Sequence, residues 1–273
     1  MKKTLITLLA MGAFNASAAT LVAEWDDFSA PTVNYSPTDN TTPTGYTYTS
    51  GDYSIVTSTA TTTSSDGEYL NIEGANPAPA SIDLSAAGLT FTNGITINMR
   101  VRNCETVSSS SPNTALFSVA TSATTNGMLV GITQSNASGG FAYNGSDSKI
   151  TTTQTTPSVN QSGLRDDVVF SYVTVTIQSV ADTTKPDVYF YYNGVLSATG
   201  TVSTWNIGDA ISKIYLGGWS ASDNSRLQYT LDSLSVYNGA MSADEVAKLV
   251  PEPTTATLSL LALCGLAARR RRK

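Results

Sequence analysis

Histidine is absent from the 273 residues of this sequence. Its absence excludes Ser-His-Asp and Cys-His catalysis, zinc bound through histidine, and a pH switch based on imidazole. Cysteine is almost as scarce, because only Cys104 and Cys264 occur. The remaining chemistry must therefore come from carboxylates, amides, hydroxyls and aromatic rings.

The amino-terminal residues have the pattern of a signal peptide. Lys2 and Lys3 are followed by an apolar run over residues 4–14 and by the sequence Ala16-Ser17-Ala18. A basic segment, an apolar segment and an A-x-A site are the three parts of a secretory signal. We therefore expect residues 1–18 to be removed by signal peptidase during export; the alternative interpretation is an amphipathic first helix.

The last 24 residues also form three parts: a Pro-Glu-Pro turn, an apolar run over residues 258–268, and a basic tail. A helix over these eleven apolar residues would measure about 16 Å, whereas a membrane span needs about 20 residues. Positive charges after an apolar run stay on the cytoplasmic side. The segment therefore suits a sorting signal better than a permanent anchor.

This carboxyl-terminal pattern resembles the PEP-CTERM signal of Gram-negative-type bacteria, which exosortases process. Cys264 departs from the pattern, since alanine or glycine is more usual within the apolar run. The resemblance implies an exported protein that is inserted transiently in the inner membrane, cut near the motif, and retained at the cell surface or in the extracellular matrix. The residues that carry it are Val250, Pro251, Glu252, Pro253, Arg269, Arg270, Arg271 and Arg272.

Without these two ends the chain is strongly acidic. Residues 19–250 contain eight basic and 20 acidic side chains, a net charge of −12. Such a surface repels phosphate backbones, which argues against nucleic acid as a partner, and favours divalent cations. Removal of Cys264 with the terminal segment leaves Cys104 as a single thiol, which we interpret as a small buried hydrophobe.

The composition indicates an all-β domain over residues 19–249. Threonine and serine are abundant, and short β-branched or aromatic runs alternate with Gly, Asn, Asp and Ser clusters. Residues 30–66 read as a long loop or irregular edge strands. The predicted strands are 21–28, 95–102, 116–120, 128–133, 140–144, 168–180, 187–192 with its partner after Asn193-Gly194, 211–217 and 228–237.

Two local sequence patterns predict specific structures. Asn193-Gly194 lies between two extended runs and supplies the positive φ angles of a type I′ hairpin turn. Ser242 and Glu245 have the spacing of a capping box, which predicts a short helix from there to Leu249.

The segment Tyr229–Glu245, with its Leu-Asp pair, Tyr237-Asn238 and Ser-x-x-Glu helix, resembles the end of laminin-G-like domains. The Tyr191–Val195 hairpin, Tyr215–Gly218 and Leu21–Phe28 are similar to other parts of those domains, in the same order. The resemblance implies a concanavalin A-like jelly-roll sandwich of two sheets. Most families of this fold are lectin-like or adhesive modules, and some members are glycoside hydrolases.

The carboxylates argue against the hydrolase option. Retaining glucanases of this fold carry Glu-x-Asp-x-Glu, which places two carboxylates about 5–5.5 Å apart, and this sequence has no such motif. Glu24 and Asp26 share a strand face but lack a third member. We therefore expect no enzyme; a degenerate glycoside hydrolase or a lyase without histidine is the alternative.

Asp232 is the carboxylate with the most unusual predicted position. Strand parity places it with Leu234 and Val236, on the side expected to face the core. A buried carboxylate needs partners, which are either hydrogen bonds to a loop or a Ca²⁺ ion. The first and last strands are often neighbours in this fold family, so Glu24 and Asp26 would complete a calcium site with Asp232.

Tyr189, Tyr191 and Trp219 are the predicted ligand-binding aromatics. If residues 188, 190 and 192 face the core, Tyr189 and Tyr191 project outward side by side, and Trp219 precedes a polar loop. Exposed rings can stack on sugars, although they can also simply cover the sheet. The expected function is binding of extracellular polysaccharide or another surface component; a purely architectural matrix protein is a further alternative.

Overall fold

The computed structural model describes most of the region between the two terminal segments. The described residues are 19–59, 61–63, 67–72, 80–106, 113–121, 124–133, 141–145, 148–151, 167–179, 183–201, 205–218 and 227–251. Among them, no helix has the length and apolarity needed to cross a membrane.

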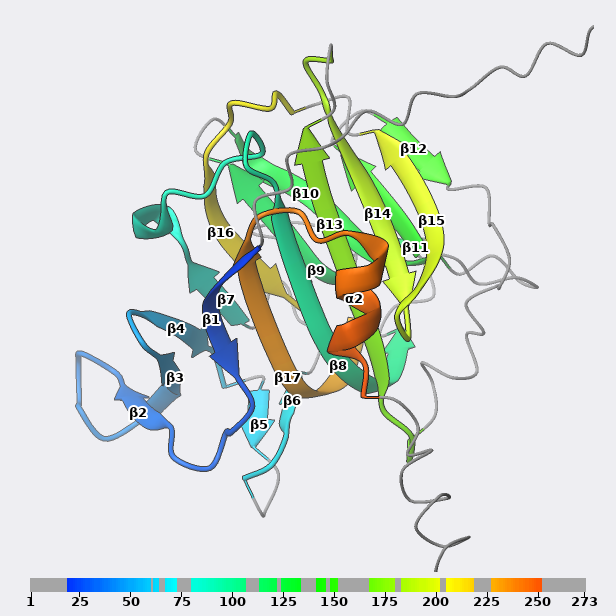
Figure 1. Cartoon of the computed structure of the whole chain (residues 1–273). Helices are drawn as coiled ribbons and strands as arrows, with labels where there is room; N and C mark the ends of the chain where they lie inside the picture. Colours follow the sequence, from blue (N-terminus) through cyan, green and yellow to red (C-terminus); the bar gives the residue numbers. More distant parts are fainter. Residues whose placement is uncertain are drawn as a thin grey trace, which may run out of the picture.

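The described residues form two antiparallel sheets packed face to face (Figure 1). The predicted two-sheet β-sandwich is thereby confirmed. The first sheet has the order β15-β14-β13-β8-β17-β6-β5, with β1 also paired to β17. Its strands are β1 (Thr20–Trp25), β5 (Thr61–Thr63), β6 (Leu70–Ile72), β8 (Ile95–Thr106), β13 (Ser171–Ser179), β14 (Pro186–Tyr192), β15 (Val195–Thr201) and β17 (Leu227–Asn238).

The second sheet has nine strands in the order β12-β11-β10-β9-β16-β7-β4-β3-β2. Residues 30–66, expected as a loop or irregular strands, contribute β2, β3 and β4 to one edge of it and β5 to the edge of the first sheet. The strands are β2 (Thr32–Tyr35), β3 (Pro43–Ser50), β4 (Tyr53–Thr57), β7 (Ala80–Asp83), β9 (Asn113–Thr121), β10 (Thr124–Thr133), β11 (Phe141–Gly145), β12 (Ser148–Thr151) and β16 (Ile211–Leu216), with the 3₁₀ turn η1 (Ser85–Ala87) after β7.

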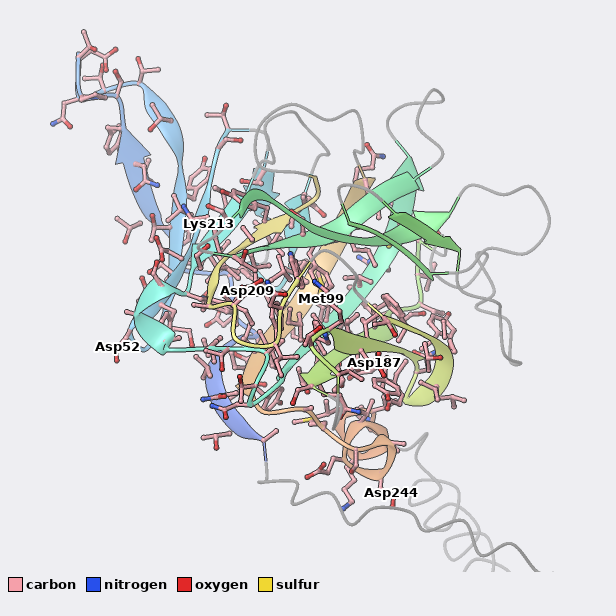
Figure 2. All side chains as sticks on the ribbon, turned by 90° about the horizontal axis from the view of Figure 1, so that it is seen from above. Asp52, Met99, Asp187, Asp209, Lys213 and Asp244 are labelled. Carbon is pink, nitrogen blue, oxygen red and sulfur yellow. The ribbon has the colours of Figure 1, made fainter. Side chains whose placement is uncertain are left out.

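The core follows from the alternation of side chains along each strand. Val173, Val175 and Ile177 of β13 are fully buried, and Ile97 and Met99 of β8 lie beside them. Figure 2 shows Met99 between the two layers. The apolar faces of both sheets thus exclude water from a single interior.

The two tryptophans expected to be packed are buried. Trp25 is 2% exposed and donates its indole N–H to the carbonyl of Tyr48 at 2.9 Å, while Trp205 is 1% exposed and stacks on Phe91 at a centroid distance of 4.6 Å. Indole N–H groups require such a partner when they are buried.

The predicted hairpin turn and the predicted capping box are both confirmed. Asn193 and Gly194 have φ angles of 47° and 79°, as the type I′ turn between β14 and β15 requires. Helix α2 (Ala243–Leu249) begins after Ser242, whose side chain accepts a hydrogen bond from the backbone N–H of Glu245 while the Glu245 side chain accepts one from the backbone N–H of Ser242.

Helix α2 lies on the outer face of the first sheet, in front of its strands in Figure 1, and contacts β15. Val246 of the helix is fully buried with Met241 and Tyr191, which form a small second apolar cluster outside the main core. Figure 2 shows Asp244 on the exposed side of α2, away from the sheet. The helix therefore buries part of the outer face of the first sheet.

A β-bulge interrupts β17 next to Asp232. Leu231 pairs with Val101 and Ser233 with Arg100, so the register shifts between them. Leu231 and Leu234 are both fully buried, although residues i and i+3 of a regular strand point to opposite faces. The bulge changes the parity of the strand, and this places Asp232 on the outer face.

Candidate functional site

A pocket of about 580 Å³ lies at one end of the first sheet, on its outer face beside α2. Six parts of the chain meet here: the start of β1, the turn before β8, the ends of β13 and β17, β14, and the segment that leads into α2. Antiparallel pairing brings these strand ends together, since Asn238 pairs with Thr20 on one side and with Ile95 on the other.

The lining is polar, aromatic and uncharged. Most lining residues have amide, hydroxyl or tyrosine side chains, and none of the described residues that line the pocket has a charged side chain. The lining residues are Thr20, Thr92, Asn93, Gln178, Ser179, Tyr189, Tyr191, Asn238, Gly239, Ala240, Met241, Ser242 and Ala243. Groups of this kind donate and accept hydrogen bonds without selecting for a charge.

Thr96 of β8 holds the wall formed by residues 239–241. Its hydroxyl donates to the carbonyl oxygen of Gly239 at 3.0 Å and accepts from the backbone N–H of Met241 at 3.0 Å. The backbone N–H of Gly239 donates to the carbonyl oxygen of Gly94, also at 3.0 Å. These buried bonds fix the wall to the rigid sheet, so the pocket is preformed.

Gly94 and Gly239 allow this wall to approach closely. Both have positive φ angles, 79° and 120°. A Cβ on Gly94 would lie 2.7 Å from Cβ of Ala240, and one on Gly239 would lie 2.9 Å from Cα of Ala19. Any side chain at either position would push the pocket wall away from its neighbours.

The two tyrosines predicted as exposed sugar-binding rings line this pocket, but they are not both exposed. Tyr191 is only 4% exposed because Met241 and Val246 cover it, and Tyr189 is half-buried beside it. Burial, together with the neighbouring Tyr189, raises the pKa of Tyr191. The prediction that both rings project freely is therefore wrong, since the strand pattern does not reveal that α2 covers this face.

Several predicted site residues lie outside the described part of the chain. Trp219 is one of them, and so are Glu252, Pro253 and residues 269–272 of the proposed sorting signal. Val250 is half-buried and Pro251 is exposed, directly after α2.

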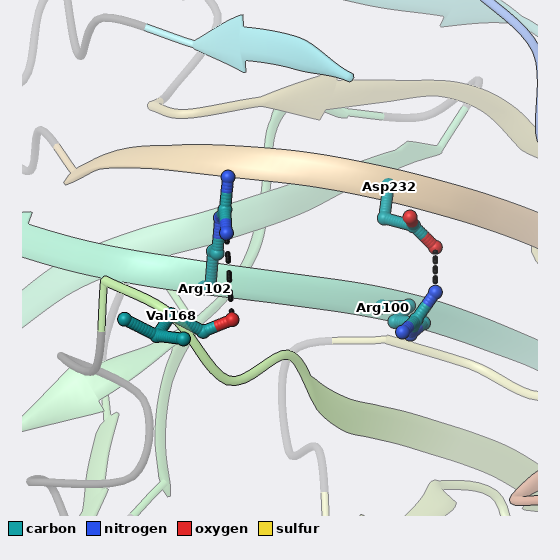
Figure 3. Close-up of polar contacts among 4 residues, drawn as sticks. All are labelled: Arg100, Arg102, Val168 and Asp232. Carbon is teal, nitrogen blue, oxygen red and sulfur yellow. Dashed lines mark hydrogen bonds and ion pairs between the residues drawn. The ribbon is translucent and has the colours of Figure 1, made fainter. Parts of the chain in front are cut away.

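Asp232 lies in a different environment from the one predicted. Its Oδ2 atom is 2.7 Å from Nη1 of Arg100, and the two side chains are 17% and 38% exposed (Figure 3). The guanidinium of Arg100 also lies over the ring of Phe170, at 4.8 Å from the centroid. The expected inward position is wrong, because the bulge directs this carboxylate to an arginine on the outer face.

Arg102, two residues along β8, continues this cluster. Its guanidinium lies over the rings of Tyr69 and Phe170, at 5.0 and 4.5 Å from their centroids. Its Nη1 donates to the carbonyl oxygen of Val168 at 3.4 Å (Figure 3). Aromatic faces attract such cations. Arginine and aromatic side chains thus cover this end of the outer face, far along the strands from the tyrosine pocket.

The described residues do not form the ligand set of the predicted calcium site. β1 and β17 are neighbours, as expected, but Glu24 accepts a hydrogen bond from Ser235 at 3.1 Å and Asp26 is exposed beyond the end of β1. Within the described ranges, no group of three His, Cys, Asp or Glu side chains could hold a metal ion.

Sequence reasoning missed the amides of the pocket. Asn93, Gln178 and Asn238 lie on three elements that are distant in the chain, and all three lie at or next to a strand end. Asn238 follows Tyr237 within the segment that resembles the end of laminin-G-like domains. That resemblance is the one sequence feature that could have indicated a role for Asn238.

Comparison with solved structures shows the same fold within Trypanosoma rangeli sialidase. The chain is similar to Trypanosoma rangeli sialidase in complex with 2,3-difluorosialic acid (TM-score 0.56, 15% identity) and with the inhibitor DANA (TM-score 0.53, 17% identity), in each case over 84% of this chain and 32% of that chain. It also matches domain 4 of AbnA, a GH43 arabinanase from Geobacillus stearothermophilus, in complex with arabinotriose (TM-score 0.44, 15% identity, 85% of this chain and 98% of that chain).

These matches correct the expectation that the protein is not an enzyme. The similar chains include sialidases, so the fold occurs within catalytic proteins and gives no ground for excluding catalysis. The chain spans about a third of the length of those sialidases. At this identity the likeness shows the fold alone.

A search of the curated proteins found no match. A scan against family descriptions found the concanavalin A-like lectin/glucanases superfamily over residues 76–247, which is more than half of the chain. This span includes most of both sheets, the tyrosines of the pocket and the start of α2. The chain therefore belongs to the concanavalin A-like lectin/glucanases superfamily, in its laminin-G-like branch.

Proposed function

We propose that this protein is exported and that its sandwich domain, residues 19–249, binds polysaccharide at the pocket beside α2. The observation that carries the proposal is the chemistry of the pocket, in which two tyrosine rings face amide and hydroxyl side chains without any charged side chain among the described lining residues. Saccharides present the complementary pattern of hydroxyl groups and apolar ring faces.

The pocket also has the size of a small-ligand site. Its volume of about 580 Å³ lies within the range of small-molecule sites, about 300–1,000 Å³. Tyr189 is half-buried at its wall and offers a ring face together with a hydroxyl. An aromatic body with a polar tip combines both kinds of contact with a sugar.

Export and retention belong to the same proposal. Signal peptidase would remove residues 1–18, and an exosortase would process residues 250–273 after their transient insertion in the inner membrane. The pattern of a Pro-Glu-Pro turn, an apolar run and a basic tail supports this proposal. The protein would then contact polysaccharide at the surface or in the extracellular matrix of the cell.

A glycan array probed with the protein purified from its host's extracellular fraction tests the binding. We expect saturable binding that falls about tenfold in Tyr189→Ala, because a stacked ring and its hydroxyl contribute about 1.5 kcal/mol. Tyr215→Ala is the matched control, since Tyr215 is a half-buried tyrosine on β16 of the opposite sheet.

Equal losses in both variants, or no saturable binding at all, would contradict the proposal. Analysis of the bound glycans by mass spectrometry says in addition whether the domain cleaves what it binds. Terminal sequencing of the same sample tests export and processing separately.

A further inference from the structure

The first residue of the proposed mature chain lies at the pocket. Ala19 directly follows the A-x-A site, and Thr20, the next residue, is part of the pocket lining. Ala19 is half-buried and packs against the cluster of Tyr191, Met241 and Val246. Its position is therefore fixed by contacts on the outer face of the first sheet.

The backbone nitrogen of Ala19 lies close to the pocket wall. An ideal Cβ on Gly239, which lines the pocket, would be 3.6 Å from this nitrogen and 2.9 Å from Cα of Ala19. Only glycine at position 239 leaves room for this approach. In the precursor this nitrogen is an amide, whereas after cleavage at Ala18 it is a free amine.

We propose that, once residues 1–18 are removed, the α-ammonium group of Ala19 forms a positively charged corner of the pocket and binds the carboxylate of an acidic saccharide. The inference rests on the proposed polysaccharide binding and narrows its ligand to saccharides that carry a carboxylate. Because the described lining has no charged side chain of its own, this ammonium group is the charge that the pocket lining itself would contribute to binding.

The neighbouring groups leave the ammonium free for a ligand. Tyr189, Tyr191 and Tyr237 face this region from the strands, and burial raises the pKa of Tyr191 and of Tyr237, so both stay neutral up to pH 9. On β1, Glu24 is held by Ser235.

Helix α2 contributes the other charges near this end of the sheet. Glu245 accepts hydrogen bonds from the backbone N–H and the hydroxyl of Ser242, both at 2.8 Å, and these bonds occupy its carboxylate. Asp244 and Lys248 are exposed on the helix. The α-amino group, with an unperturbed pKa of about 7.7–8.0, is then the group expected to titrate between pH 6.5 and pH 9.

Signal-peptide removal would thus complete the binding site. A precursor has an uncharged amide at this position and a chain that continues from the pocket wall. Binding of the acidic polymer would begin only after export, outside the membrane.

Three forms of the chain, each ending at Lys273, test this inference. One begins at Ala19 with a free amine, the second has the same residue acetylated, and the third has a single glycine before Ala19, which displaces the amine by up to about 3.8 Å. The probes are a trimer of galacturonic acid and its methyl ester, titrated by calorimetry at pH 6.5 and pH 9.

We expect the free-amine form to bind the acid about tenfold more tightly at pH 6.5 than at pH 9, because a hydrogen bond to a charged group is worth about 1.5–3 kcal/mol. The acetylated form should bind the acid about tenfold more weakly at pH 6.5, without pH dependence, and the glycine form should lie between the two. The ester should bind all three forms within twofold at both pH values, which also shows that each pocket is intact.

Equal binding of the acid to the free and acetylated forms would overturn the inference, and so would the same pH dependence in both. If the ester binds in either of these cases, the polysaccharide-binding function survives and only the role of Ala19 fails. If neither trimer binds any form, both proposals fail for this class of ligand.

Discussion

Nη1 of Arg100 and Oδ2 of Asp232 are 2.7 Å apart across two neighbouring strands, at the bulge that interrupts β17. The ion pair depends on the bulge. Without the bulge, strand parity would direct Asp232 into the core, where an unpaired carboxylate is costly. With it, the carboxylate meets an arginine that also stacks on Phe170.

Loss of this carboxylate should destabilise the domain moderately. We expect Asp232→Asn to lower the free energy of unfolding by about 1 kcal/mol, because solvent screens a pair whose arginine is 38% exposed. Asp52→Asn, an exposed aspartate in the turn between β3 and β4, is the matched control and should change stability by less than about 0.5 kcal/mol. Urea unfolding of both variants measures the difference, and equal stabilities would contradict it.

A comparison of Gly94 with Gly88 distinguishes the cost of a steric clash from the cost of a positive φ angle alone. Both have positive φ angles, but a Cβ on Gly94 would lie 2.7 Å from Cβ of Ala240, whereas one on Gly88 would have no atom within 4 Å. We expect Gly88→Ala to cost about 1 kcal/mol and Gly94→Ala at least about 2 kcal/mol. Thermal unfolding of the two variants gives the comparison; similar losses would mean that residues 239–241 move without cost.

Gly94→Ala should also weaken glycan binding, since Ala240 and Gly239 form part of the pocket wall. Gly88→Ala lies outside the pocket and should leave binding unchanged.

Acid should weaken the cap of α2. Hydrogen bonds from Ser242 hold the pKa of Glu245 below its usual value of 4.5. A carboxylate with a lowered pKa in the folded state stabilises it at pH values above the usual pKa and loses this effect as the pH falls through the lowered value. The difference in melting temperature between the protein and Glu245→Gln should therefore be present at pH 6 and shrink as the pH falls below 4.5.

Asp244→Asn is the control for this series. Asp244 lies in the same first helical turn, and no hydrogen bond of its side chain to another described residue is seen. We expect a small, nearly constant difference for this variant. A difference for Glu245→Gln that stays constant with pH would contradict the proposed cap.

Cys104 should be unreactive in the folded protein. Its side chain is 1% exposed, and burial raises the pKa of the thiol far above its usual value. Since the thiolate is the reactive form, we expect alkylation by iodoacetamide at pH 8 to be more than 100-fold slower in buffer than in denaturant. Peptide mapping distinguishes Cys104 from Cys264, and rapid labelling of Cys104 without unfolding would be inconsistent with this burial.

The strands were the most predictable part of the structure. Alternating residues such as those of β8 and β13 are governed by local rules, and so are the Asn193-Gly194 turn and the Ser242 cap. These features depend on residues close together in the sequence. The family resemblance then supplied the two-sheet arrangement.

The site could be predicted only in part, because it depends on tertiary contacts. Tyr189 and Tyr191 were correctly placed on the outer face of β14, but their burial follows from α2, about 50 residues further along the chain. One extra residue in β17 was enough to reverse the predicted direction of Asp232. The pocket itself joins six parts of the chain, which no single stretch of sequence reveals.

Strands β1 and β17 are paired, and α2 returns over the same sheet, so Ala19 and Pro251 both leave the domain on one side. A protein attached to the envelope through the residues after Pro251 would turn this side towards the envelope and the nine-stranded sheet away from it. The attached end and the tyrosine pocket would then both face the cell envelope. A polymer strand bound in the pocket would run between the protein and the envelope.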